Sequence, residues 1–516
     1  MAAALLSALL LWMSAPPIAA GWLAWVALVP AAVVVLREPA ANAGRLAVPL
    51  AYAFYLELLL VPALPFGLAD GQWGDPAIPV LIGGSPVLAV ALVAIPLVGA
   101  ALWAVRFGEP WGASRFRGRP AAIAAIAVPA LAWTALDFAR SNLDPGGLWG
   151  PLFLSQSGEP TAVLAALAGP WALTLAVVAV NYGLALALVR HRVLPALVPP
   201  ALTLAAVLIA SWASEPAAPG PRVPVAAIQP GYDTVEEDRW VLRRFEPGSW
   251  DRSALDLVRD LGELTRSAAE AGAEVVVWPE ASMYVDPRAT PRVRRELRSL
   301  ASETGATLVI PFFLPAPGKG ATLAVVPSGG SARLTRARPK QRPMWWLGER
   351  SDASGHPAPL PASGLAVGTM LGVDSQDPRL AAELAGEGAE LLTSGTHDWR
   401  QSAVQHRAYE QLAAGGAGLP LVRADWRYGS AVYDHEGRML ADAGEGLTRT
   451  IVIATVRTGP GSTPYAGLGD LVGWVAVAFV GLSALLGLRR RARPARKANE
   501  AMPALGSADG ARAKRA

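Results

Sequence analysis

Two charged residues of this chain stand where α/β folds often place catalytic groups. Glu280 follows the apolar run Ala273–Trp278 and a proline, so its carboxylate lies at the carboxyl end of a predicted strand. Lys340 stands further along, in the basic segment Arg338–Pro343. A carboxylate can serve as a general base, and an ammonium group can stabilise an oxyanion. Each residue taken alone also has a simpler interpretation, as a loop carboxylate or as a solvated lysine.

A third segment also ends a predicted strand, in a turn that contains glycine. The run Leu365–Leu371 predicts a strand that continues into Gly372-Val373-Asp374. The 516 residues contain no cysteine, which excludes disulfides, thiolate zinc sites, iron–sulfur clusters and cysteine nucleophiles. The five histidines lack the spacing of metal ligands, and there is no glycine-rich phosphate loop. We therefore expect neither a metal nor a cofactor.

The elements that would position these residues alternate between strand and helix over residues 221–465. Expected strands are Val225–Ile228, Ala273–Trp278, Thr307–Ile310, Leu323–Val326, Leu365–Leu371, Glu390–Thr393, Leu421–Arg423, Ser430–Tyr433 and Thr450–Val456. Expected helices are Ser253–Ala271, Arg292–Thr304, Leu380–Gly386 and Ala403–Ala414. This order predicts a mixed α/β sandwich with its helices outside and its reactive groups at strand ends.

The rest of the chain is too apolar for a soluble protein. Hydrophobic residues make up 53% and charged residues 17%, where soluble domains have about a quarter charged. Apolar runs occur at Ala2–Met13, Gly21–Leu36, Leu46–Leu64, Ile78–Val105, Ala121–Phe138, Val163–Leu188, Val193–Trp212 and Leu471–Leu488. We expect a seven-span membrane domain (1–214), an α/β domain (221–465), a closing transmembrane helix (468–490) and a basic tail (491–516).

The loop charges predict which side of the membrane each part occupies, because cytoplasmic loops accumulate Lys and Arg. Basic residues occur in every second loop and after the last run, at Arg37, Arg45, Arg106, Arg115, Arg117, Arg119, Arg190, Arg192, Arg489, Arg490, Arg491, Arg493, Arg496 and Lys497. The intervening loops carry none. We expect both termini in the cytoplasm and the α/β domain on the outer face. The net charge of +4 does not suggest nucleic acid.

Glu280, Lys340 and the 372–374 turn, in this order, resemble the carbon–nitrogen hydrolase (nitrilase) superfamily, whose catalytic set is Glu, Lys and Cys. Within it, the membrane architecture resembles the apolipoprotein N-acyltransferase family. Further matching segments are Leu148–Gln156, Val225–Pro230, Leu391–Trp399, Gln405-His406 and Pro420–Arg423. The resemblance implies a nitrilase-like α-β-β-α sandwich in a bacterial inner-membrane protein. It also implies phospholipid and possibly a lipoprotein N-terminus as partners.

Carried over by position, the resemblance makes Glu280 the general base and Lys340 the cation that stabilises the oxyanion. Gly372 falls at the position of the nucleophilic cysteine, and Asp374 at that of the carboxylate two residues later. Glu349 matches an additional glutamate, although its spacing from Lys340 is one residue longer than usual.

A later Arg-Ala-x-Glu motif of the family is interpreted as reduced to Ala413-Ala414-Gly415-Gly416. Thr369 and Ser375 are near the nucleophile position, but they are not expected to replace the thiol. His397 could orient substrate or make only a surface hydrogen bond. The apolar loop containing Trp345 and Trp346 is expected to touch the outer leaflet, with domain packing as the alternative.

Three hypotheses follow from the missing thiol. The first hypothesis is a catalytically impaired or inactive member of the family that binds lipid or lipoprotein. The second is an acyltransferase or amidase that uses Glu280 and Lys340 without cysteine. The third hypothesis is a structural or interaction protein of the cell envelope. The first is favoured, because removing the nucleophile of a covalent catalyst costs on the order of 10⁶ in rate.

Overall fold

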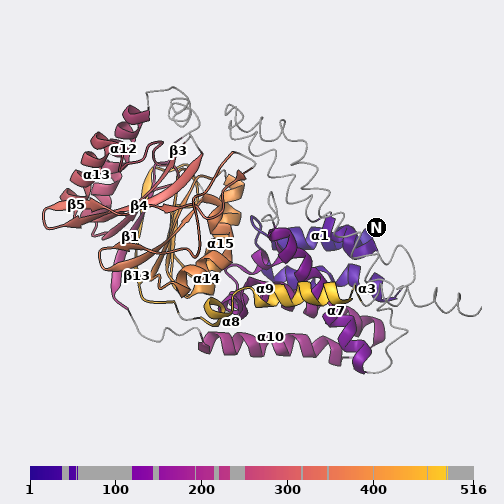
Figure 1. Ribbon diagram of the computed structural model, residues 1–516. Helices are drawn as coiled ribbons and strands as arrows, with labels where there is room; N and C mark the ends of the chain where they lie inside the picture. Colours follow the sequence, from indigo (N-terminus) through magenta and orange to yellow (C-terminus); the bar gives the residue numbers. More distant parts are fainter. Residues whose placement is uncertain are drawn as a thin grey trace, which may run out of the picture.

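The computed structural model describes residues 1–37, 46–53, 55, 119–142, 150–191, 193–213, 220–232, 250–314, 318–345, 348–398, 400–444, 446–461, 463–483 and 485. The predicted run Ile78–Val105 and most of Leu46–Leu64 lie outside these residues. A helical bundle and an α/β domain lie side by side (Figure 1). Helix α8 lies where the two meet, and the C-terminal helical segment, drawn in yellow, lies along the bundle.

The bundle consists of apolar helices of unequal length. Its elements are α1 (Ala2–Ser14), η1 (Gly21–Leu23), α2 (Ala24–Ala27), α3 (Val29–Arg37), α7 (Arg119–Ser141), η3 (Leu152–Gln156), η4 (Pro160–Val163), α8 (Leu164–Ala168), α9 (Pro170–Arg190) and α10 (Leu194–Ala213). Three described helices are long and apolar enough to cross a membrane, namely Ala122–Ser141, Pro170–Arg190 and Leu194–Trp212. Ala2–Ser14, Gly21–Arg37 and Leu471–Ser483 are apolar but shorter. The helices support a membrane-anchored protein, although fewer described helices qualify than the eight runs suggest.

One predicted span is interrupted in the structure. The run Val163–Leu188 divides at Gly169 into α8 and α9, and Gly169 has φ of 78°. A Cβ at this position would lie 2.4 Å from the ring of Tyr465. Glycine is therefore required both by the backbone conformation and by the close approach of Tyr465.

Polar side chains in the bundle satisfy backbone groups that lipid could not. Asn181 on α9 donates to the carbonyl of Ala24 at 2.8 Å and accepts from the amide of Leu28 at 2.8 Å. These two contacts bridge the irregular junction between α2 and α3. Within hydrocarbon, backbone groups must find partners in the protein itself.

The α/β domain contains two stacked sheets. The first has the order β13-β1-β2-β3-β4-β5, with β6 paired to β4, and the second has the order β12-β11-β10-β9-β8-β7. The strands are β1 (Arg222–Gln229), β2 (Val275–Val277), β3 (Thr307–Leu314), β4 (Lys319–Ser328), β5 (Ser331–Leu334), β6 (Arg338–Pro339), β7 (Leu360–Ala362), β8 (Leu365–Leu371), β9 (Leu391–Thr396), β10 (Leu421–Asp425), β11 (Ala431–Tyr433), β12 (Met439–Asp442) and β13 (Thr450–Arg457). Strands β1, β2 and β3 run parallel, as do β8, β9 and β10.

Helices cover the outer face of each sheet, which confirms the predicted α-β-β-α sandwich. The helices are α12 (Trp250–Glu270), α13 (Pro291–Thr304), η6 (Gly372–Gln376), α14 (Pro378–Gly386), α15 (Arg400–Ala417) and α16 (Pro464–Leu468). Apolar side chains such as Val225, Val277, Leu391 and Val422 fill the space between the sheets. The pair α12 and α13 lies on the side away from the bundle, and α14 and α15 lie on the side near it (Figure 1).

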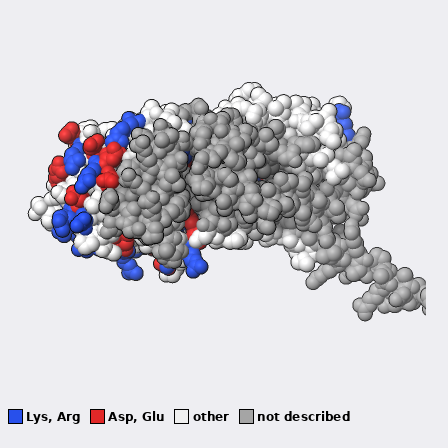
Figure 2. Space-filling model, turned by 90° about the horizontal axis from the view of Figure 1, so that it is seen from above, with Lys and Arg blue, Asp and Glu red and all other residues white. Residues whose placement is uncertain are grey.

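The domain meets the bundle through α15 and aromatic side chains. The ring of Phe153 in η3 packs edge-on against Trp171 of α9 and Tyr409 of α15, with centroids 5.0 and 5.6 Å away. On the face seen in Figure 2, charged side chains gather over the α/β domain, and the described part of the bundle is almost free of them. This division of charge suits a bundle in lipid and a domain in water.

Candidate functional site

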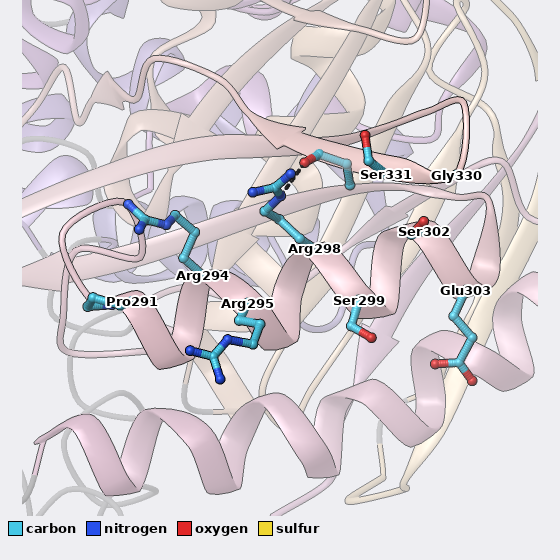
Figure 3. A pocket seen from close by; sticks show the side chains of 10 residues that line it. Pro291, Arg294, Arg295, Arg298, Ser299, Ser302, Glu303, Gly330 and Ser331 are labelled. Carbon is cyan, nitrogen blue, oxygen red and sulfur yellow. Dashed lines mark hydrogen bonds between the residues drawn. The ribbon is translucent and has the colours of Figure 1, made fainter.

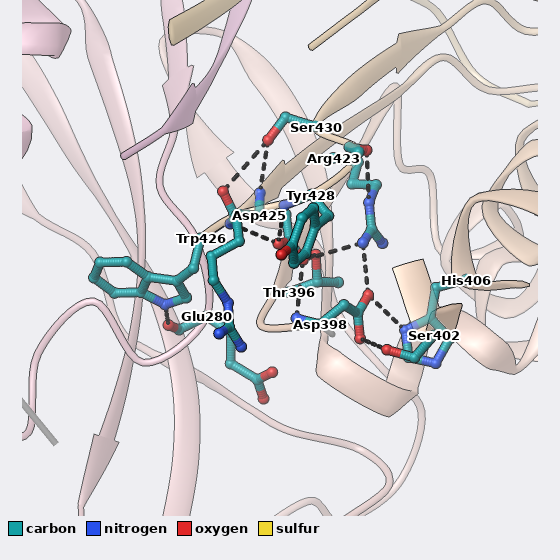
Figure 4. A network of polar contacts seen from close by, with 12 residues as sticks. Glu280, Thr396, Asp398, Ser402, His406, Arg423, Asp425, Trp426, Tyr428 and Ser430 are labelled. Atoms are coloured by element: carbon teal, nitrogen blue, oxygen red, sulfur yellow. Dashed lines mark hydrogen bonds and ion pairs between the residues drawn. The ribbon is translucent and has the colours of Figure 1, made fainter. Parts of the chain in front are cut away.

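Glu280 lies in a turn held between the two sheets. Strand β2 ends at Val277, after which Pro279 cannot donate to the sheet and Ala281 takes a positive φ of 51°. The amide of Glu280 donates to the carbonyl of Thr396 at 3.3 Å, and the indole of Trp426 donates to the carbonyl of Glu280 at 2.5 Å. The backbone of Glu280 is thus fixed while its carboxylate points away (Figure 4).

The structure brings Lys340 and Glu349 to this carboxylate. The ammonium of Lys340, 1% exposed, lies 3.2 Å from Glu280 Oε1 and 3.0 Å from Glu349 Oε2. Lys340 follows β6, and its amide donates to the carbonyl of Gly320 at 2.9 Å. The amide of Met344 donates to Glu349 Oε2 at 2.7 Å. The extra residue between Lys340 and Glu349 is therefore accommodated in the loop.

Burial and neighbouring charges change the pKa of both Glu280 and Lys340. The pKa of Glu280 is raised above its ordinary value, because burial penalises its charge more than Lys340 stabilises it. Burial alone would lower the pKa of Lys340, but the carboxylates of Glu280 and Glu349 outweigh it and raise the pKa. A carboxylate with a raised pKa beside a firmly protonated ammonium is an arrangement suited to general-base chemistry with oxyanion stabilisation.

Gly372 lies directly against the carboxylate of Glu280. It begins η6 with φ of 55°, a left-handed conformation that glycine adopts without strain. A Cβ at this position would lie 2.5 Å from Oε1 and 2.6 Å from Oε2 of Glu280. The carboxylate of Glu280 therefore occupies the space into which a side chain at position 372 would project.

Asp374 supports the loop that carries Lys340. Its buried carboxylate accepts from the amides of Gln341 at 3.0 Å, Arg342 at 2.6 Å and Leu371 at 3.2 Å. Burial raises the pKa of Asp374 to about 6 despite these contacts and the nearby Lys340. Its oxygens are committed to backbone amides, so it joins the Lys340 loop to the Gly372 turn.

Other residues singled out from the sequence lie around this cluster. The hydroxyl of Ser375 donates to the carbonyl of Gly372 at 3.0 Å. The ring of His397 lies 6.2 Å from that of Trp426, centroid to centroid. Trp345 is 59% exposed, whereas its neighbour Trp346 lies outside the described residues.

Sequence reasoning missed a buried polar network behind the site (Figure 4). Arg423, fully buried on β10, contacts both oxygens of Glu410 at 3.1 Å, and also Asp398 at 2.6 Å and Asp425 at 3.1 Å. Burial by itself would raise the pKa of Asp398, but His406 and Arg423 hold it well below its usual range. No local motif announces this network, because its members come from two strand ends and a helix.

Glu410 also corrects one interpretation of the sequence. Helix α15 carries Arg407-Ala408-Tyr409-Glu410, an intact Arg-Ala-x-Glu that precedes Ala413–Gly416, the stretch interpreted as its reduced form. The carboxylate of Glu410 accepts from Ser394 at 2.6 Å as well as from Arg423. The motif is retained, so it gives no support to loss of function.

A groove on the outer surface of the domain contains none of these residues. It has a volume of about 640 Å³ and lies between α13 and the β4–β5 turn (Figure 3). Arg294, Arg295 and Arg298 line it together with serine hydroxyls. Among the described residues there is no group of three or more His, Asp and Glu that could hold a metal ion.

The sequence is similar to a protein family and to three individual proteins. Residues 225–460 match the carbon-nitrogen hydrolase family. The chain is 28% identical to the apolipoprotein N-acyltransferase of Gloeobacter violaceus over 93% of this chain and 91% of the relative. It is 25% identical to that of Geobacter metallireducens over 95% of each. It is also 25% identical to the apolipoprotein N-acyltransferase of Photobacterium profundum, over 75% of this chain and 78% of the relative.

Solved structures match a little under half of the chain. A carbon-nitrogen hydrolase from Helicobacter pylori G27 is 17% identical, with a TM-score of 0.36, over 46% of this chain and 89% of that one. An amidase from Nesterenkonia sp. is also 17% identical, with a TM-score of 0.34, over 46% of this chain and 90% of that one.

Proposed function

Since the chain belongs to the apolipoprotein N-acyltransferase family of carbon–nitrogen hydrolases, we propose that it binds phospholipid and lipoprotein N-termini without forming an acyl-enzyme. The observation that carries this proposal is Gly372, which lies at the turn facing Glu280, the partner of Lys340, and supplies no nucleophile. The protein is accordingly a catalytically impaired or inactive member in the bacterial inner membrane.

The chemistry of the site supports this division between binding and turnover. In a thiolate mechanism, the sulfur would attack the ester carbonyl of a phospholipid, expel the lysophospholipid alkoxide and form a thioester. Glu280 would take the thiol proton and Lys340 would face the oxyanion, but no sulfur is present to form the bond. The remaining Glu280–Lys340–Glu349 cluster offers a carboxylate and an ammonium to an ester or an amine.

The proposal is tested with the full-length protein in lipid nanodiscs. A fluorescent phospholipid and a diacylated lipopeptide are added separately and together, and both binding and acyl transfer are measured. We expect binding of each with no acyl-enzyme and no transfer above background. Transfer that is abolished by Glu280→Gln would overturn the proposal, and so would failure to bind either ligand.

A second candidate is direct transfer without a covalent intermediate, favoured by the 3.2 Å contact between Lys340 and Glu280. Glu280 would remove a proton from the lipoprotein amine as its nitrogen attacks the phospholipid ester. The C–O bond would then break, and the same proton would pass to the departing lysophospholipid oxygen. This route requires both substrates at once, so sequential kinetics with no trapped acyl-enzyme would identify it.

The orientation in the membrane is part of the same proposal. The alternation of basic loops supports cytoplasmic termini and an α/β domain on the outer face. The exposed Trp345, near Glu349 in the chain, supports contact of this loop with the outer leaflet. If Trp345→Ser leaves binding of the protein to phospholipid unchanged, the role proposed for this loop is wrong.

A further inference from the structure

A chain of buried polar side chains ends on the turn that carries Gly372. Arg423 Nη2 lies 2.6 Å from Asp398 Oδ2, and the same oxygen lies 2.7 Å from Nδ1 of His406. On its other side, the ring of His406 contacts the side-chain amide of Gln376 through Nε2. All four side chains are at least nine-tenths buried. We call Arg423, Asp398, His406 and Gln376 the polar chain.

Both ring nitrogens of His406 face polar partners. Asp398 is an acceptor held in place by Arg423 and by the hydroxyl of Ser402 at 3.0 Å, so Nδ1 of His406 is the donor to it. Nε2, on the other side of the ring, faces the side-chain amide of Gln376. With a polar partner at each nitrogen, the buried ring of His406 is fixed in orientation.

The other end of the polar chain reaches the site itself. Gln376 is the last residue of η6, and Gly372 is the first. On the opposite side, Asp374 fastens η6 to the amides of Gln341 and Arg342, next to Lys340. The turn is therefore held from two sides, by the Lys340 loop and by α15 through His406.

We infer that His406 is a positioning residue, which acts through Gln376 to hold Gly372 against the carboxylate of Glu280. It touches no reacting atom, and its effect is on the placement of the turn. The inference rests on the proposed function in placing the binding site at Glu280, Lys340 and Gly372. Its test needs neither lipid nor transfer, so the two can fail separately.

The absence of cysteine makes the position of the turn measurable. In full-length Gly372→Cys, the new thiol is the only one in the chain. The rate of its alkylation by iodoacetamide as a function of pH reports on its neighbours, because only the thiolate reacts. Held against Glu280, which contacts Lys340, the thiol should have a pKa different from the value of about 8.5 for free cysteine.

The pH at which the alkylation rate is half its maximum is the midpoint of the profile. Changes in the polar chain should move this midpoint toward 8.5. We expect His406→Phe and Gln376→Met, each added to Gly372→Cys, to shift the midpoint by the same amount. Each should change the alkylation rate at pH 7.5 by at least about threefold. The double change should add nothing further, because both act on one contact. His406→Gln can still place a polar amide near Gln376 and should restore part of the original profile.

The matched control is His356→Leu, which alters an exposed histidine outside the polar chain. It should leave the profile of Gly372→Cys unchanged. An unchanged profile in folded His406→Phe or in Gln376→Met would overturn the inference. So would a midpoint of 8.5 in Gly372→Cys itself. If His406→Phe fails to fold, Gln376→Met decides the question, because it leaves Arg423, Asp398 and Glu410 in place.

Discussion

At the scale of single residues, the site is defined by a group that is missing and by the groups that surround it. The sequence places Glu280 and the 372–374 turn at strand ends and Lys340 in a basic segment, and the structure brings Lys340 and the backbone of Gly372 against Glu280. The positive φ of Gly372 is not visible in the sequence, because glycine is common in ordinary turns. The contact of Lys340 with Glu349 also could not be read from spacing, since the intervening loop can absorb an extra residue.

Restoring a thiol at the turn should restore covalent chemistry in part. In Gly372→Cys, Glu280 must move to admit the new side chain, and a side chain at φ of 55° costs about 1–2 kcal/mol of stability. Because the obstructing atoms are the end of a flexible side chain, we expect a folded protein that accumulates an acyl-enzyme with fluorescent phospholipid. Intact-protein mass spectrometry measures this adduct.

Two controls accompany the restored thiol. Gly372→Ala carries the same backbone strain and should form no adduct, and Gly372→Cys with Glu280→Gln should form it far more slowly. If the folded Gly372→Cys variant shows no adduct, then position 372 is not that of the nucleophile.

Asp374 should give stability a dependence on mildly acidic pH. Its pKa is raised from 3.8 to about 6, so the folded protein binds this proton more tightly than the unfolded chain does. Its contribution is thus fully present below about pH 4 and is lost as pH rises through about 6, by on the order of 3 kcal/mol. Asp374→Asn should remove this slope, so the wild type should lose thermal stability relative to the variant between pH 4 and 6.5. Parallel melting curves over this range would contradict the expectation.

At the scale of elements, apolar strands were predictable and short edge strands were not. The buried runs that became β1, β3, β8 and β9 are visible as apolar segments. Strands β6, β7 and β12 were missed, because their two to four residues include polar or proline positions and are defined by pairing. One missed strand, β6, places Lys340, so part of the site depends on a pairing without a local signal.

The network around Arg423 should contribute strongly to the stability of α15 and the second sheet. Arg423→Met would leave Glu410, Asp398 and Asp425 buried without their shared cation, at a cost of about 3–5 kcal/mol. Thermal unfolding followed by tryptophan fluorescence measures the loss. The control is Arg259→Met, which removes an exposed ion pair with Asp256 and should cost less than about 0.5 kcal/mol. If the two changes reduced stability equally, the buried network would contribute no more than an exposed ion pair.

At the scale of the whole molecule, the α/β domain and the bundle are joined through specific side chains. Asp470, at the start of the last helical segment, accepts from Trp171 of α9 at 3.0 Å and from Tyr465 of α16 at 2.8 Å. The ring of Tyr465 fits beside Gly169, where the predicted long span divides. Composition alone separated a membrane part from an α/β part, but these contacts join residues almost 300 positions apart and leave no pattern in the sequence.

The orientation of the whole molecule can be tested by cysteine labelling, because the natural chain has no thiol. Ser331→Cys places a single thiol on the exposed β4–β5 turn, and Val193→Cys places one in a loop beside Arg190 and Arg192, where Val193 is 69% exposed. If basic loops face the cytoplasm, a membrane-impermeant maleimide applied to cells with an opened outer membrane should label Ser331→Cys. Val193→Cys should react only after the inner membrane is permeabilised. The reverse result would place the α/β domain in the cytoplasm, away from the leaflet in which Trp345 is proposed to lie.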